Sequence, residues 1–111
     1  MTSDFEAKLL AGAAYKIFFE ELSKHLEATA TLFDTTEWSA EEVKQAIGRF
    51  HTIRGSAGFF KFTTLAATAG ELEVTMQGRA ADELAGQIDL LRELYRKLTE
   101  AASTIPAPAQ G

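Results

Sequence analysis

The sequence predicts an all-α fold, an up-down-up-down antiparallel four-helix bundle with a short additional N-terminal helix. Three observations support this prediction. No segment shows the sustained period-two alternation of β-branched residues that is typical of a half-buried strand. The only prolines, Pro106 and Pro108, lie in the C-terminal stretch TIPAPAQG. Four long segments carry apolar residues at the three- and four-residue spacing of an amphipathic helix.

Two helices are expected in the N-terminal third of the chain. A short one is predicted from Ser3 or Asp4 to about Ala11, and a long one from about Ala13 to Phe33. The polar stretch DTTEWS is expected to end the long helix. Its inward-facing residues are predicted to be the large apolar ones: Tyr15, Phe18, Phe19, Leu22, Leu26 and Phe33.

The next long helix has a well-marked start. Ser39 followed by Glu42 fits a capping box, in which each side chain bonds the backbone N–H of the other residue. A turn is predicted between Gly58 and Thr63. The apolar face between these limits consists of Val43, Ala46, Ile47, Phe50, Ile53 and Ala57.

Two further helices complete the predicted bundle. One ends near Gly78 and the last runs from about Ala80 to Ala102. We therefore expect one bundle domain over residues 1–103, followed by a Pro- and Ala-containing tail or linker over residues 104–111. The buried positions of these helices are predicted to be Leu65, Ala69, Leu72, Met76, Leu84, Ile88, Leu91, Leu94 and Leu98.

Composition excludes several classes of function. The net charge is −5 and Lys and Arg form no continuous stripe, so we expect no binding to nucleic acid. The chain has no cysteine, which excludes disulfides and thiolate metal sites. No apolar run approaches 18 residues, and the start MTSDFEAK does not resemble a signal peptide. A cytoplasmic domain without membrane contact is the expectation.

The stretch FHTIRGSAGFF places His51 among glycines inside an otherwise good helix. On a helical wheel His51 lies about 115° from the centre of the apolar stripe, toward solvent. Lys44, Gly48, Gly55 and Gly58 share its side of the helix. Each glycine in a helix interior costs about 1 kcal/mol relative to alanine. A lone surface histidine usually has no special role, but the coincident glycines favour a surface that a partner approaches closely.

Two residues are candidates to act on the ring. Arg54 follows His51 by about one helical turn, where its guanidinium suits an arriving phosphate. Taken alone, Arg54 fits an ordinary solvated helix arginine better. If the hairpin turns about Phe62, the residue level with His51 is Glu73. A carboxylate that accepts a hydrogen bond from Nδ1 leaves Nε2 with a free lone pair. The alternative is that Glu73 is an ordinary surface glutamate.

The stretches HTIRGSAGFFKF and LAATAGELE resemble the signature of histidine phosphotransfer (HPt) domains, His-x-x-Lys-Gly-Ser/Gly-Ala. The matching positions are His51, Gly55, Ser56, Ala57 and Leu65. The likeness is greatest to the phosphoacceptor domain of CheA-type chemotaxis kinases, in which a glutamate twenty-two residues after the histidine bonds its ring. Glu73 occupies that place.

This chain departs from the family pattern at three positions. Arg54 stands where lysine is usual, and Lys61 replaces a glycine that is usual at the turn. Gly70 stands where CheA-type domains often carry a second histidine, so part of their hydrogen-bond network is expected to be absent.

The resemblance implies a mechanism. His51 would accept a phosphoryl group on Nε2 and pass it to a receiver-domain aspartate. Arg54, with Lys44, would screen the phosphoryl charge, and the glycine strip with Ser56 would dock the partner. The chain has no Walker-type phosphate loop. ATP and Mg²⁺ are therefore expected only on partners, a histidine kinase catalytic domain and a response-regulator receiver, and the domain itself is expected to be a phosphocarrier without a bound cofactor.

Three other hypotheses remain at this point. The chain could be the phosphoacceptor part of a CheA-like kinase that is phosphorylated by its own ATP-binding domain. A metal- or haem-binding bundle would have to use His25 and His51, a poor ligand set without cysteine or a Glu-x-x-His pair. A structural helical adaptor is the third hypothesis, and it leaves the glycine strip unexplained.

Overall fold

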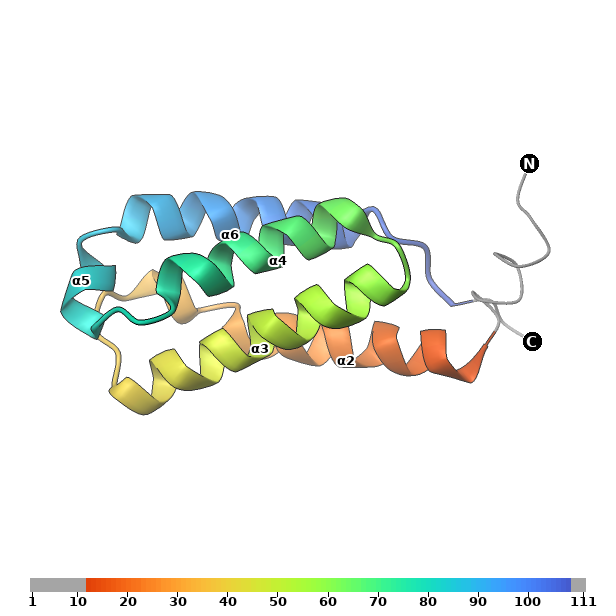
Figure 1. Cartoon of the computed structure of the whole chain (residues 1–111), viewed down its shortest axis with the longest axis horizontal. Helices are drawn as coiled ribbons and strands as arrows, with labels where there is room; N and C mark the ends of the chain where they lie inside the picture. The colour runs from red at the N-terminus through yellow and green to blue at the C-terminus, as the bar shows by residue number, and fades with distance from the viewer. Residues whose placement is uncertain (1–11, 109–111) are drawn as a thin grey trace.

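The computed structural model describes residues 12–108, so the helix predicted from residue 3 or 4 to 11 lies outside the described residues. Four long helices run alternately up and down along one axis (Figure 1). They are α2 (Ala13–Thr29), α3 (Ala40–Phe59), α4 (Thr63–Met76) and α6 (Ile88–Ser103), with a 3-10 turn η1 (Leu32–Asp34) and a short helix α5 (Ala81–Ala85) in the connections. The predicted four-helix bundle is confirmed.

The predicted apolar faces form one core. Every residue in the described range that was expected to face inward is buried or half-buried. Full burial of such side chains contributes about 1.5–3 kcal/mol each, which far exceeds the helix propensities involved. At the α3–α4 turn, Phe60 and Phe62 pack their rings against Tyr15 and Phe18 of α2. The core thus ties α2 to the hairpin that carries His51.

The start of α3 is fixed as predicted. Ser39 Oγ accepts a hydrogen bond from the Glu42 N–H at 3.0 Å, and the Glu42 carboxylate accepts one from the Ser39 N–H at 3.0 Å. This capping box satisfies two N–H groups that the first helical turn leaves without intrahelical partners.

The α3–α4 turn accommodates Lys61 in a left-handed backbone conformation with a φ of 65°. Glycine is favoured there because a Cβ atom costs about 1–2 kcal/mol in this region. The Phe62 N–H donates to the Ala57 carbonyl at 2.9 Å and closes the turn. The turn is therefore closed although Lys61 stands at the position where glycine is usual. This closed turn determines the register of α3 against α4.

Two helix boundaries differ from the prediction. The helix expected to reach Phe33 ends at Thr29, because the chain bends so that the Phe33 ring packs against Trp38 and Tyr95. The Trp38 indole N–H also donates to the Leu32 carbonyl at 2.7 Å and holds η1 in place. The last helix is divided into α5 and α6 at Gly86, a poor helix former.

Part of the predicted linker lies against the bundle. The buried Tyr15 hydroxyl donates a hydrogen bond to the Pro106 carbonyl, and Ile105 is half-buried against the core. Burial raises the pKa of the Tyr15 phenol. The residues directly after α6 therefore pack onto α2 instead of extending away from it.

Candidate functional site

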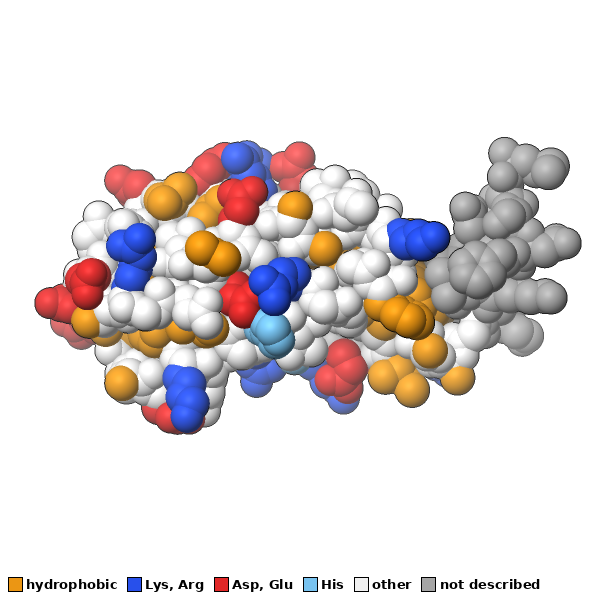
Figure 2. Space-filling model, in the orientation of Figure 1, with side chains coloured by type: hydrophobic (Ala, Val, Ile, Leu, Met, Phe, Trp, Pro, Cys, Tyr) orange, Lys and Arg blue, Asp and Glu red, His pale blue; other side chains and the backbone are white. Residues whose placement is uncertain are grey.

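His51 lies in the middle of α3 with 61% of its side chain exposed. Figure 2 shows a histidine near the centre of the visible face of the molecule, with one basic and one acidic side chain directly against it. Its Nδ1 lies 2.7 Å from Oε2 of Glu73 on α4. No hydrogen bond to Nε2 occurs from the part of the chain that the structure describes. One ring nitrogen is therefore held while the other faces solvent.

Glu73 is buried, with only 8% of its side chain exposed. The tight α3–α4 turn brings it level with His51, the pairing expected from a turn near Phe62. A buried carboxylate is costly unless charge partners and donors surround it. Its Oε2 accepts from His51. Its Oε1 lies 3.1 Å from a terminal guanidinium nitrogen of Arg54, which gives an ion pair without hydrogen-bond geometry, and Oε1 has no hydrogen-bond partner among the described residues. Glu73 is thus not an ordinary surface glutamate.

Arg54 points along α4 toward Glu73. Its second terminal nitrogen lies 3.3 Å from His51 Nδ1, farther than the carboxylate oxygen at 2.7 Å. A ring nitrogen has either one hydrogen or one lone pair, so Nδ1 cannot serve both neighbours. The shorter contact indicates that Nδ1–H donates to Glu73. The guanidinium consequently lies on the Nδ1 side of the ring, and its contact with an incoming phosphoryl group stays a prediction.

The glycine strip is exposed and smooth. Lys44, Gly48, Gly55 and Gly58 all lie at the surface of α3. A Cβ atom placed on any of these three glycines would meet nothing within 4 Å, so none of them is required by packing inside the chain. The half-buried Ser56 uses its hydroxyl within the helix, donating to the Thr52 carbonyl at 2.7 Å.

His25, the other histidine, has a different environment. It is half-buried on α2, and its Nδ1 lies 3.1 Å from a terminal nitrogen of Arg49. A guanidinium only donates, so Nδ1 of His25 must be the acceptor. Burial and then the Arg49 charge lower the pKa of His25, against a smaller opposing effect of Glu21. Within residues 12–108, no three possible metal-ligating side chains gather at one place.

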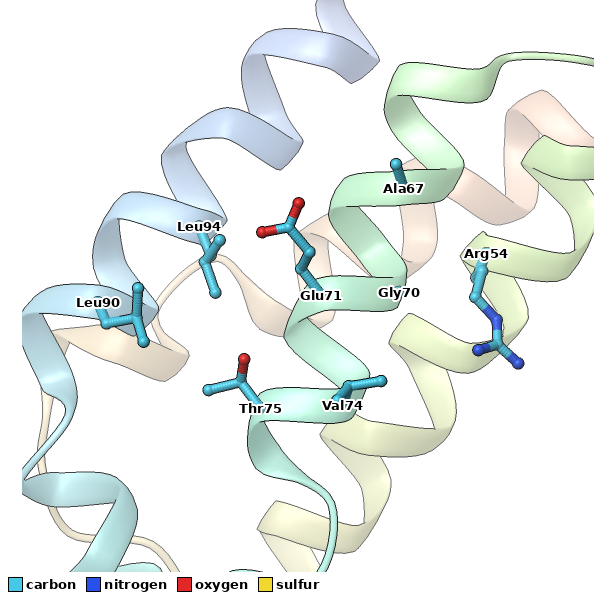
Figure 3. A pocket seen from close by; sticks show the side chains of 8 residues that line it. All are labelled: Arg54, Ala67, Gly70, Glu71, Val74, Thr75, Leu90 and Leu94. Carbon is cyan, nitrogen blue, oxygen red and sulfur yellow. The ribbon is translucent and has the colours of Figure 1, made fainter.

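A shallow groove between α4 and α6 begins at Arg54 (Figure 3). Exposed Val74 and Leu90 lie along it. Gly70 forms part of its wall, and a Cβ atom there would lie only 3.0 Å from Cδ of Arg54. Sequence reasoning noted at Gly70 only the missing histidine and overlooked this contact. The sequence feature that indicated this contact was an arginine in place of the usual, shorter lysine at position 54, together with a residue without a side chain, Gly70, on the facing helix.

Comparison with known proteins gives one finding. The Hpt domain family model matches residues 13–103, whereas no curated protein and no solved structure gives a significant match. Among residues 12–108, the helices are too short or too polar to cross a bilayer. The match covers most of the chain and includes the exposed histidine with its carboxylate partner. The chain therefore belongs to the Hpt domain family, whose members serve histidine phosphotransfer in phosphorelays.

Proposed function

We propose that His51 is the phosphoacceptor of this domain, and that it carries a phosphoryl group from a histidine kinase or receiver domain to a response-regulator aspartate. The Nε2 lone pair attacks phosphorus, the P–N bond forms, and the bond from phosphorus to the donor breaks. In the second half of the cycle a receiver carboxylate attacks, and the P–N bond breaks. The domain is a phosphocarrier and not an autonomous enzyme.

The observation that carries the proposal is the Nδ1–Glu73 hydrogen bond on a ring that is otherwise exposed. With the proton held on Nδ1, Nε2 has a lone pair directed to solvent. When Nε2 attacks, the ring acquires positive charge, and the buried carboxylate 2.7 Å from Nδ1 stabilises it. Glu73 thus orients the ring and offsets the charge that develops.

The partner surface follows from the shape of α3. The strip of Gly48, Gly55 and Gly58 around His51 lets a receiver backbone or side chain reach the ring. The exposed Lys44 and Arg54 supply the positive charge that screens the phosphoryl oxygens. Mg²⁺ and ATP belong to the partner proteins in this scheme, and the reaction takes place in the cytoplasm.

A second candidate is the phosphoacceptor domain of a CheA-like kinase. The feature that favours it is the carboxylate twenty-two residues after the histidine, paired with Nδ1. The residue at position 70 argues for a more distant relation, since glycine replaces the second histidine of that group. Phosphorylation by a CheA-type ATP-binding domain with ATP, compared with phosphorylation by a phosphorylated receiver, distinguishes these two donors.

The decisive experiment incubates the domain with a phosphorylated receiver and tests the label for lability in acid and stability in base. We expect His51→Gln to abolish labelling with unchanged helicity by circular dichroism, and His25→Gln to label normally. Label that persists in His51→Gln would exclude His51 as the acceptor. Absence of label in the wild-type chain with every donor would favour the structural adaptor.

A further inference from the structure

The aliphatic part of Arg54 lies across α4 at the position of Gly70. A Cβ atom on Gly70 would lie 3.0 Å from Cδ and 3.7 Å from Cγ of Arg54. A contact of 3.0 Å is tighter than nine in ten real Cβ contacts, so the Arg54 side chain would have to shift by a few tenths of an ångström for a Cβ atom alone. A longer side chain at position 70 would require a larger shift. Figure 3 shows Arg54 extending from α3 beside α4 at the level of Gly70.

This path leads directly to Glu73. Residues three apart on a helix are neighbours on one face, so Gly70 and Glu73 lie one above the other on α4. The Arg54 chain crosses the first and its guanidinium reaches Oε1 of the second at 3.1 Å. A larger residue at position 70 would stand between the Arg54 methylene groups and α4.

The guanidinium also supplies positive charge that balances the buried Glu73 carboxylate, so the imidazole does not have to supply all of it. Among residues 12–108, His51 and Arg54 are the two groups paired with the buried Glu73 carboxylate. If Arg54 is displaced, the carboxylate retains the imidazole alone, and a buried anion then favours a second proton on the ring. A doubly protonated ring has no lone pair on Nε2 and cannot attack phosphorus.

We infer that Gly70 and Arg54 act as one positioning unit: the missing side chain at position 70 seats Arg54 on α4, so that its guanidinium neutralises Oε1 of Glu73 and leaves Oε2 to hold Nδ1–H of a neutral His51. The inference rests on the proposed function of His51 as the phosphoacceptor. It gives a role in this site to the glycine that stands where CheA-type domains often carry a histidine.

The test uses the full chain labelled with ¹⁵N and compares Gly70→Leu with Ala28→Leu. The control places a leucine at an exposed position of α2 that has no part in the site. The ¹⁵N shifts of the His51 ring at pH 7 report the fraction of rings with a proton on Nδ1 only, and phosphoramidate reports phosphoryl acceptance without a protein partner. We expect Gly70→Leu to lower both quantities by roughly two- to tenfold, the lower part of the range for residues in contact, and Ala28→Leu to change neither.

A double-mutant cycle with Arg54→Ala identifies the route of the effect. If Gly70 acts through Arg54, Gly70→Leu changes nothing further in the Arg54→Ala background. Additive effects, or unchanged ring shifts in Gly70→Leu, would overturn the inference. Should Gly70→Leu fail to fold, Gly70→Ala gives the same comparison with a smaller displacement. The ring shifts require no phosphotransfer, so labelling of His51→Gln would refute the proposed function and leave this result unaffected.

Discussion

The two histidines of this chain occupy opposite chemical environments. His51 on α3 faces a buried carboxylate, so its Nδ1 donates and its lone pair is on Nε2. His25 on α2 faces a guanidinium, so its Nδ1 accepts and its proton is on Nε2. The two rings therefore carry the proton on different nitrogens. The partner on the adjacent helix, and not exposure alone, determines which ring nitrogen of each imidazole has the lone pair.

Removing the carboxylate is expected to have the largest effect. Glu73→Ala deprives Nδ1 of its acceptor, so the proton distributes over both ring nitrogens and the developing charge loses its counter-ion. We expect acceptance from phosphoramidate to fall roughly ten- to a hundredfold, the range for loss of the carboxylate partner of a metal-ligating histidine. Glu71→Ala, which removes an exposed carboxylate from the same helix, serves as the control. Equal rates for the two variants would show that the hydrogen bond has no part in transfer.

The surroundings of the two histidines also differ in the size of their side chains. Glycines lie around His51, whereas the neighbours of His25 include the charged Lys24 and Glu21. Gly55→Gln places a side chain one turn from His51 in open space. Transfer from a phosphorylated receiver should fall about tenfold or more, a loss of about 1.4 kcal/mol of docking. Phosphorylation by phosphoramidate should stay nearly unchanged, because a small molecule needs no smooth strip.

The comparison of these two donors decides the role of Gly55. Equal losses would mean that it serves the ring environment and not docking. Gly55→Ala should retain transfer and raise the free energy of unfolding by up to about 1 kcal/mol, measured by urea titration. A fall in stability would contradict the conclusion that this glycine is not needed for packing.

The smallest expected effect concerns His25 and pH. Burial and the Arg49 charge hold its pKa in the folded state below the usual value of 6.5, so the folded state binds fewer protons than the unfolded state. The contribution of neutral His25 to the free energy of unfolding is complete above pH 6.5, and it is lost as the pH falls through the pKa of the folded state. Urea titrations from pH 7.5 to 5 should show a steeper fall for the wild type than for His25→Gln. Identical pH profiles would show that folding does not lower the pKa of His25.

Local signals in the sequence predicted most of this architecture. The capping box at Ser39 and the apolar spacing of α3 and α4 depend on residues within a few turns, and they agree with the structure. The pairing of His51 with Glu73 was also accessible, because helical rise and the turn position determine which residues are level.

The remaining features depend on contacts between distant residues. The end of α2 depends on where the Phe33 ring packs, on Trp38 and Tyr95, which no local pattern contains. The direction of Arg54 depends on open space over Gly70, sixteen positions away in the sequence. A long flexible side chain has many rotamers, and a residue on another helix selects among them.

The hydrogen bond between Nδ1 and Glu73 has a consequence for the direction of phosphoryl transfer. In the proposed cycle the same hydrogen remains between ring and carboxylate when the phosphoryl group arrives, while it is carried, and when it leaves. Neither half of the cycle then has to take up or release a proton at this domain. The site therefore favours neither direction of transfer. The relative concentrations of phosphorylated donors and unphosphorylated acceptors determine the net direction of phosphoryl transfer.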